Sequence, residues 1–439
     1  MKPDATGSDG TRERMPPPAD KRLQTTDRRQ TMKMAVALSG VAAFGTKAAK
    51  AADEGADPGP TLPRQTAPGD DVMSPPYGRP SIYQARVVRR ERTGGSPYPT
   101  RKAAVSLTPL QDLHGVITPN GLHYERHHFG VPTIDPNAHR LIIHGEVEKP
   151  MIFTVADIMR FPAVSRICFL ECSGNTQNWG EPVAEYTVQD THGLLSCCEW
   201  TGAALKTVLS EVGVSPSARW MLAEGADSGA MTRSIPIEKV FDDALLAYAQ
   251  NGERLRPEQG YPLRMLLPGF EGNTSVKWLR RLKFGLEPWQ TREETSKYTW
   301  VMPDGSVRQF NFVMEAKSVI TSPSGGQKLE DRGFYEISGL AWSGHGKIAK
   351  VDVSFDGGGS WTAAALQEPV LPKSLTRFRA PWRWTGDAAV LTSRATDETG
   401  YVQPSRDELL KQRDARSYYH YNGMQRWRVG EDGVVSNAG

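Results

Sequence analysis

Cysteine is scarce in this chain, with only four cysteines in 439 residues. All four fall in one short window, at Cys168, Cys172, Cys197 and Cys198. An even count is compatible with disulfides, but a bridge between the adjacent pair would be strained. No Cys-x-x-Cys-His sequence is present, which excludes covalent attachment of a c-type haem to this chain. No Cys/His pair with zinc-ligand spacing follows Cys172, which argues against a structural zinc site.

The chain also lacks a strong charge imbalance and a long apolar run. Its formal net charge is +3 and no dense Lys/Arg stripe is present, so the sequence gives no electrostatic case for nucleic-acid binding. Its longest apolar stretch is too short and weak for a membrane span, and we predict none. Hydrophobic residues make up 38% and charged residues 23%, as in globular proteins, and the length favours two folded domains with tails.

The first hundred residues differ from the rest of the chain. Residues 1–52 are predicted to form a tail with a twin-arginine-type signal peptide: Arg28-Arg29, an apolar stretch over 34–45 and a small-residue cleavage site at Ala49-Lys50-Ala51. A periplasmic location follows from this interpretation, and the alternative is a disordered Ala-rich leader. Residues 53–105 are rich in Pro, Gly and Arg and are predicted to be a linker or arm.

Residues 106–305 mix helix and strand signals, which predicts an α+β domain. Thr154 and Asp157 form a capping-box pattern for a helix that ends before Pro162. Thr201 is expected to cap a second helix, and Pro236 to begin a third. Strands are expected around 141–143, 263–267 and 276–279.

Residues 306–430 show few helix signals. Val351, Val353 and Phe355 alternate with polar residues, and a Gly-rich turn over 356–359 follows. Short strands between Gly and Pro turns predict an antiparallel β-sandwich of immunoglobulin type without its disulfide. Residues 431–439 are expected to be a tail.

Cys172 is the most informative position in the sequence. An apolar, strand-like run precedes it, and the small residues Ser173 and Gly174 follow, so a bulky group can approach the backbone there. A thiolate at such a strand end suits a nucleophile or a soft metal ligand, and the alternative is a buried structural thiol. The amide of Asn175 can bind a bound group or fix the turn.

Several runs resemble the sulfite oxidase family of molybdenum enzymes, over nearly the whole chain from about 109 to 429. They are 124–132, 171–175, 260–264, 276–279, 353–361 and 394–404. Within that family, the runs 121–128, 169–176, 224–236 and 292–298 are most similar to molybdenum subunits of Sox-system sulfane dehydrogenases. The resemblance implies a molybdopterin-binding α+β domain followed by an immunoglobulin-like dimerisation domain.

The resemblance also implies the cofactor, which is molybdenum held by one molybdopterin with Cys172 as the thiolate ligand. The anionic pterin would be bound by cationic and polar side chains, and fixed cations suit a buried anionic group. At the matching positions these are Arg126, His128, Ser173, Asn175, Arg264 and Lys277. Gln259 stands where the family often has a second pterin-binding histidine.

Four residues are implied as catalytic candidates, namely Tyr298, Arg126, Gln177 and Arg383. Tyr298 stands where the family keeps a tyrosine that relays a proton beside the metal, and its alternative is a loop tyrosine. Arg126 would face the metal centre as well as the pterin. Thr176 and Gln177 replace two arginines that sulfite oxidases typically have, and the second of those arginines helps to bind sulfite. Arg383 can supply a second-domain cation instead, or stack between surface tryptophans.

The activity implied by the resemblance is oxidation of sulfur with oxygen transfer, the electrons leaving singly to a c-type cytochrome. The missing arginine favours sulfane sulfur on a carrier protein, because protein contacts away from the metal can supply binding energy. A homodimer or heterotetramer is expected. One alternative is a sulfite dehydrogenase that oxidises free sulfite, and another is a cofactor-free scaffold subunit.

Overall fold

A computed structural model describes residues 80–93, 103–176 and 180–439. The expected signal peptide, with Arg28-Arg29, and the candidate Gln177 lie outside these residues. Among the helices that are described, none is both long and apolar enough to cross a membrane.

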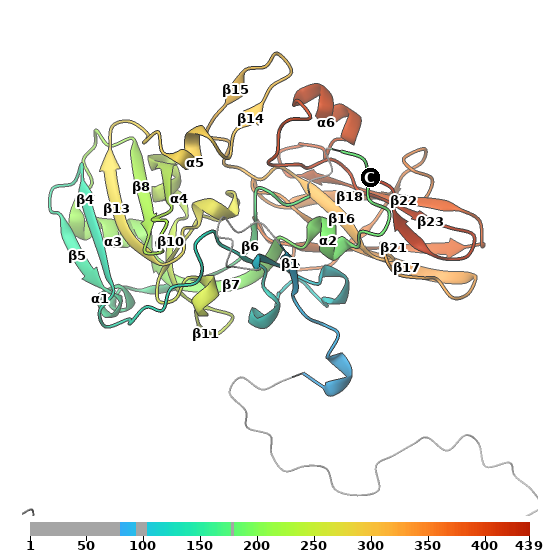
Figure 1. Ribbon diagram of the computed structural model, residues 1–439, viewed down its shortest axis with the longest axis horizontal. Helices are drawn as coiled ribbons and strands as arrows, with labels where there is room; N and C mark the ends of the chain where they lie inside the picture. The colour runs from blue at the N-terminus through green and yellow to red at the C-terminus, as the bar shows by residue number, and fades with distance from the viewer. Residues whose placement is uncertain (1–79, 94–102, 177–179) are drawn as a thin grey trace, which may run out of the picture. The chain divides into compact units, whose positions relative to one another are not determined.

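The first domain contains two five-stranded sheets (Figure 1). One has the order β11-β10-β7-β6, with β12 also paired to β10, and the other the order β5-β4-β13-β8-β9. The first is built from β6 (Ala163–Glu171), β7 (Leu195–Ala204), β10 (Leu245–Gln250), β11 (Glu253–Arg254) and β12 (Arg264–Leu266). The second is built from β4 (Arg140–Gly145), β5 (Met151–Thr154), β8 (Trp220–Gly225), β9 (Thr232–Pro236) and β13 (Leu279–Gly285). Only β13 and β4 run parallel within these two sheets.

The helices of this domain are short. The capping box of Thr154 and Asp157 is present at the start of α1 (Val155–Arg160), and Pro236 precedes α4 (Ile237–Asp242), as predicted. The expected Thr201 cap is wrong, because β7 continues through Thr201 to Ala204 and α3 (Leu205–Val212) begins only after it. Backbone pairing of β7 with β6 and β10 on both sides extends the strand beyond the local capping signal.

The remaining short elements flank the sheets. They are α2 (Val188–His192), α5 (Arg292–Thr295), β1 (Arg90–Thr93), β2 (Ala103–Leu107), β3 (Glu125–Arg126), β14 (Trp300–Val301) and β15 (Val307–Arg308), with 3-10 turns at Ile82–Gln84, Leu110–Asp112, Asn120–Leu122, Pro257–Gln259 and Gly272–Thr274. Strands β1 and β2 pair with each other, so part of the expected 53–105 linker belongs to the fold.

The second domain is a sandwich of a four-stranded and a five-stranded sheet, with the orders β16-β17-β21-β20 and β19-β18-β22-β23-β24. The first contains β16 (Lys317–Ser322), β17 (Gly333–Trp342), β20 (Ala365–Leu366) and β21 (Thr376–Trp384). The second contains β18 (Ile348–Ser354), β19 (Thr362–Ala363), β22 (Ala389–Asp397), β23 (Arg426–Val429) and β24 (Val435–Asn437), and α6 spans Arg406–Gln412. Val351 and Val353 are fully buried between the sheets, as expected, but the neighbouring polar residues Asp352 and Ser354 are buried as well.

The structure also changes the C-terminal boundary of the second domain, and it shows whether the four cysteines form disulfides. Residues 431–439 are not merely a tail, because β24 pairs with β23. All four cysteines are free, and Cys168 and Cys198 face each other across β6 and β7 as buried core residues. The fold therefore needs no disulfide in the part of the chain that the structure describes.

The two domains share a core. One hydrophobic cluster contains Phe169 and Leu195 from the first domain together with Val319 and Trp342 from the second. At its edge, the buried Glu171 carboxylate accepts hydrogen bonds from Lys317 Nζ at 2.8 Å and from Trp342 Nε1 at 2.6 Å. The residue directly before Cys172 is therefore fixed by side chains of the second domain.

Candidate active site

Cys172 directly follows the last residue of β6. Its backbone N–H donates to Leu194 O at 3.0 Å, and Asn175 N donates to Cys172 O at 2.8 Å, which closes a tight turn. The side-chain amide of Asn175 is used within this turn, because it donates to Glu171 Oε1 and accepts from Leu194 N. Of the two roles that the sequence left open for Asn175, the structure places its amide in the turn.

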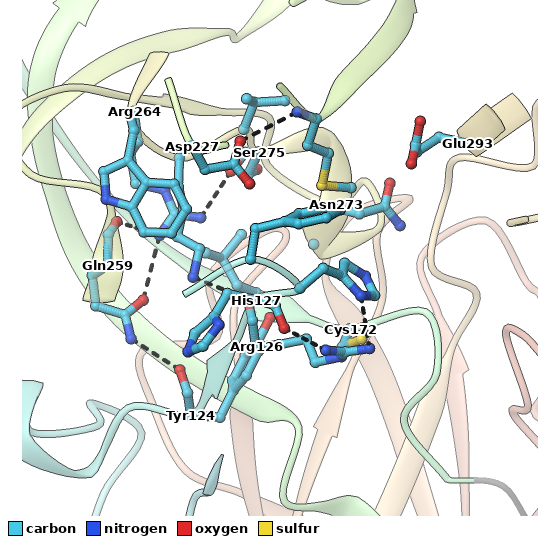
Figure 2. Close-up of a pocket in the computed structure, with 18 of the residues that line it drawn as sticks. Tyr124, Arg126, His127, Cys172, Asp227, Gln259, Arg264, Asn273, Ser275 and Glu293 are labelled. Carbon is cyan, nitrogen blue, oxygen red and sulfur yellow. Dashed lines mark hydrogen bonds between the residues drawn. The ribbon is translucent and has the colours of Figure 1, made fainter. Parts of the chain in front are cut away.

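Cys172 lines a cavity together with side chains from several distant segments of the first domain. We call it the Cys172 cavity. The resemblance assigned four cationic or imidazole side chains to the pterin, and all four line this cavity: Arg126, His128, Arg264 and Lys277. Tyr298 and Gln259 line it as well. In Figure 2, Arg264 and Gln259 lie on one side of this space and Cys172 on the other.

Backbone carbonyl groups hold these cations in place. Arg264 donates to Gln259 O and to Ser275 O, both at 2.9 Å, and Lys277 Nζ donates to Glu258 O at 2.8 Å. Lys277 also reaches Arg126 O at 3.0 Å. Neutral carbonyls thus fix the positions of Arg264 and Lys277 without pairing their charges.

Local structure at Lys277 differs from the sequence expectation. A strand was expected over 276–279, but β13 begins at Leu279, and Trp278 has a positive φ of 54°. Since side chains alternate between faces in a strand, a regular strand would fix which way Lys277 points. The loop conformation instead lets the consecutive residues Val276, Lys277 and Trp278 all line the Cys172 cavity, which the alternating faces of a regular strand would not allow.

The pKa values of these groups reflect burial and mutual repulsion. Burial, reinforced by Arg264, lowers the pKa of Lys277 to about 7. Burial also lowers the pKa of Arg264 to about 10, and burial with the neighbouring Arg126 lowers that of His128 to about 4. An anion bound in the cavity would favour the protonated forms of these groups and would raise their pKa values.

The Cys172 thiol has a raised pKa because it is buried, and the positive charge of Arg126 opposes this effect. A free thiolate is therefore costly here, whereas coordination by a metal ion would stabilise the deprotonated form. No group of three or more His, Cys, Asp or Glu side chains suited to a metal occurs among the described residues. A metal at Cys172 would thus need ligands from a cofactor, as molybdopterin provides.

The cavity has polar atoms that fit a polar cofactor. His123 Nε2, Arg264 Nε and Asn273 Oδ1 are buried and have no hydrogen-bond partner within the described residues, and all three side chains line the cavity. Buried polar atoms without partners are rare in native proteins and indicate a missing ligand or water. Together with the cations, these atoms fit a phosphate-bearing pterin held beside Cys172.

Tyr298 lies at the wall of the Cys172 cavity and contacts a buried charge network. The Arg233 guanidinium lies 4.9 Å from the centre of its ring. Arg233 in turn pairs with Glu271 at 2.8 Å and with Glu294 at 3.1 Å, and all three charged groups are buried. Burial and the nearby Cys172 raise the pKa of Tyr298, so its phenol keeps its proton at neutral pH.

The second domain contributes residues that sequence reasoning missed. His420 N donates to Ser173 O at 2.7 Å, and His420 Nε2 lies 2.9 Å from Glu271 Oε2. The ring of Tyr419 packs on that of Tyr298 with centroids 4.8 Å apart. The contacts of His420 and Tyr419 with Ser173, Glu271 and Tyr298 join residues more than 100 positions apart, so no local pattern predicts them. The aromatic run over 418–421 is the sequence signal that could have pointed to this segment.

The other expected site residues lie away from the cavity walls. Ser173 is buried, and its hydroxyl accepts a hydrogen bond from Asn273 Nδ2 at 3.2 Å. Arg383 does not line the Cys172 cavity, contrary to expectation. It is an exposed residue of β21, paired in register with Phe334 of β17, because strand alternation turns it away from the buried Trp384.

Comparison with family models matches both domains. Residues 128–293 match the oxidoreductase molybdopterin binding domain, and residues 308–420 match the Mo-co oxidoreductase dimerisation domain. The first match contains Cys172, His128, Arg264 and Lys277, and the second ends at His420.

Comparison with individual proteins gives a consistent result. The crystal structure of the sulfane dehydrogenase SoxCD from Paracoccus pantotrophus is 45% identical, with a TM-score of 0.82, covering 85% of this chain and 96% of that one. Mitochondrial sulfite oxidase from Mus musculus is 31% identical over 66% of this chain and 58% of its own length. NADH nitrate reductase from Ulva prolifera is 30% identical over 66% of this chain. The chain spans only 38% of that nitrate reductase.

Proposed function

Because the chain belongs to the sulfite oxidase family of molybdenum oxidoreductases, with a molybdopterin-molybdenum cofactor, we propose that it oxidises sulfane sulfur bound to a carrier protein. The observation that carries this choice is the 45% identity to a sulfane dehydrogenase over 96% of that chain. Arg383, one candidate for a sulfite-binding cation, does not line the cavity, which is compatible with this choice. The role of Gln177 as the replacement for a sulfite-binding arginine stays a prediction.

Residues of this chain would hold the cofactor as follows. Cys172 would bind the metal, and Arg126, Arg264 and Lys277 would bind the pterin phosphate as cations, with His128 as a hydrogen-bonding imidazole. When bound, the cofactor supplies the oxygen atom that sulfur gains and accepts the two electrons that sulfur loses. For a persulfide the balance is R–S–SH plus water giving R–S–SOH, two protons and two electrons, and the electrons pass singly to a c-type cytochrome.

Tyr298 would act as the proton-handling group at this centre. Its phenol is protonated at neutral pH, and Tyr298 lines the cavity near Cys172, as Tyr124 also does. The resemblance to the family favours Tyr298 over Tyr124 for this role. A phenol can transfer its proton to a developing oxyanion, and the resulting phenolate then regains a proton from water. Arg233 would keep the ring in place through its contact with the face of Tyr298.

We propose that the protein acts in the periplasm as a homodimer or as a heterotetramer with the cytochrome. Support comes from the Arg28-Arg29 signal in the sequence and from the match of residues 308–420 to a dimerisation domain. Oxidation of free sulfite is the second candidate, favoured by the 31% identity to sulfite oxidase. A cofactor-free scaffold is less compatible with one cavity that brings Cys172, three basic residues and Tyr298 together.

The test is cytochrome c reduction by the molybdenum-loaded protein with its cytochrome partner. Sulfite is offered against a carrier protein that bears a sulfane sulfur on a cysteine. A higher kcat/KM for the carrier supports the proposal. Efficient turnover of sulfite with none of the carrier supports the second candidate, and a purified protein without molybdenum that turns over neither supports a scaffold.

A further inference from the structure

The second-domain segment 413–420 is fixed against the loop that carries Cys172. His420 N donates to Ser173 O at 2.7 Å, and its imidazole lies between Trp300 Nε1 at 2.7 Å and Glu271 Oε2 at 2.9 Å. Arg413 Nη1 donates to His420 O at 2.6 Å. His420 has a positive φ of 58°, a conformation that persists only when its surroundings hold it.

This arrangement fixes the position of Tyr419. Its ring centroid lies 4.8 Å from that of Tyr298 and 4.9 Å from that of Tyr418, whose side chain is 54% exposed. A backbone hydrogen bond from Tyr298 also reaches Tyr419, and burial together with the charge of Cys172 raises the pKa of Tyr419 to about 12. The rings of Tyr418, Tyr419 and Tyr298 therefore form a continuous series of contacts from an exposed side chain to the wall of the Cys172 cavity.

The arginines around these rings are already engaged. Arg233, under the ring of Tyr298, is paired with Glu271 and Glu294. In the 413–420 segment, Arg413 is paired with Glu315 and Arg416 with Asp414. A sulfite dianion passing the tyrosines would lose hydration and meet guanidinium groups whose charges are already compensated, which is unfavourable.

Uncharged or weakly charged sulfur suits the same surface. Polarisable divalent sulfur makes favourable contacts with aromatic rings, and phenol hydroxyls can donate hydrogen bonds to it. A sulfane sulfur on a cysteine has this character, whereas sulfite does not. The three rings therefore favour one of the two substrate classes that the family chemistry allows.

We infer that Tyr419 is a specificity-determining residue, which admits protein-bound sulfane sulfur to the Cys172 cavity and disfavours free sulfite. This inference rests on the proposed function for its substrate class. It also assigns to the second domain a role at the substrate side of the site, in addition to dimerisation.

The experiment compares molybdenum-loaded wild-type protein with Tyr419→Arg, Tyr419→Leu and Tyr419→Phe variants. The substrates are sulfite and a short peptide bearing a cysteine persulfide, with ferricyanide as acceptor and the Cys172→Ser variant as the blank. Phe334→Arg is the matched control, because it adds the same charge at an exposed aromatic residue of the second domain. Sulfate affinity, measured by titration calorimetry, reports dianion binding independently of turnover.

Tyr419→Arg is expected to raise kcat/KM for sulfite and the affinity for sulfate by about tenfold, since a desolvated charge-assisted contact is gained. Tyr419→Leu should lower kcat/KM for the persulfide by roughly 2- to 10-fold, the range of a sulfur–aromatic contact. Tyr419→Phe should keep the persulfide within about twofold of wild type, because the ring remains.

The wild-type preference tests the proposed function, and the change in preference tests Tyr419. If wild type prefers sulfite but Tyr419→Arg still shifts the substrate ratio, the proposed function fails and the specificity role stands. If Tyr419→Arg and Tyr419→Leu retain molybdenum yet leave the ratio and the sulfate affinity as in Phe334→Arg, the inference is overturned. Should Tyr419→Arg lose molybdenum, the Tyr419→Leu comparison alone decides.

Discussion

Lys317→Met breaks the buried ion pair that joins the second domain to the residue before Cys172. Glu171 is 0% exposed and Lys317 is 1% exposed, with Nζ and Oε1 2.8 Å apart. Removing one partner of a buried pair costs about 3–5 kcal/mol, because the other charge is left uncompensated. Glu171 would keep the hydrogen bonds from Trp342 at 2.6 Å and Asn175 at 2.9 Å, so we expect the lower end, about 3 kcal/mol.

The assay is urea or thermal unfolding of the protein without cofactor, followed by measurement of molybdenum content after loading. A loss of about 3 kcal/mol corresponds to a decrease in Tm on the order of 5 °C for a chain of this size. The matched variant is Glu171→Gln with Lys317→Met, which removes both charges and should recover most of the stability. A single Lys317→Met variant within about 1 kcal/mol of wild type, or a double variant no better than the single one, would refute the reasoning.

Three further predictions concern the Cys172 cavity. Cys172→Ser should abolish turnover and strongly lower molybdenum content, with little change in the Tm of the cofactor-free protein. Because the folded-state pKa of Lys277 is lowered to about 7, Lys277 makes a contribution to the stability of the cofactor-free protein that rises from about pH 7 to pH 10.5. Burial raises the pKa values of the four cysteines, which act in the opposite direction above about pH 9, so the comparison with a Lys277 variant isolates this contribution. Lys277→Arg should flatten that rise in a series of urea midpoints. Tyr298→Phe should lower kcat about 100-fold with KM and molybdenum content nearly unchanged.

Each of these predictions has a contrary result. A metal-replete, active Cys172→Ser variant would remove Cys172 from the metal site. A pH series of urea midpoints in which Lys277→Arg parallels wild type would mean that the pKa of Lys277 is not lowered in the folded state. Unchanged kcat in Tyr298→Phe, with KM raised instead, would assign Tyr298 to substrate binding rather than to proton handling.

Local sequence patterns predicted those features whose energetics are local. The Thr154–Asp157 capping box is made within four residues, and the alternation of apolar and polar residues predicts the burial of Val351 and Val353. The Thr201 cap failed because pairing of β7 on both sides is a tertiary effect that outweighs one capping hydrogen bond.

The candidate site was predictable in part for the same reason. Cys172, Arg264 and Lys277 occur in short runs that the family shares, and the structure brings them to one cavity. Tyr419 and Glu271 reach the site only through contacts between distant segments, which no pattern along the chain records. For Arg383, the flanking tryptophans did not indicate on which face of β21 its side chain lies, and the structure places it on the exposed face.

The ion pair between Glu171 and Lys317 couples the order of assembly to the chemistry of the site. Without a folded second domain, Glu171 would lack its Lys317 and Trp342 donors and would keep only the hydrogen bond from Asn175 next to the Cys172 thiol. A negative charge there opposes both thiolate formation and the approach of an anionic pterin. Folding of the β-sandwich therefore increases the affinity of the first domain for its cofactor, and by linkage the bound cofactor stabilises the folded sandwich. Tight cofactor binding by the first domain is in this way coupled to folding of the second domain.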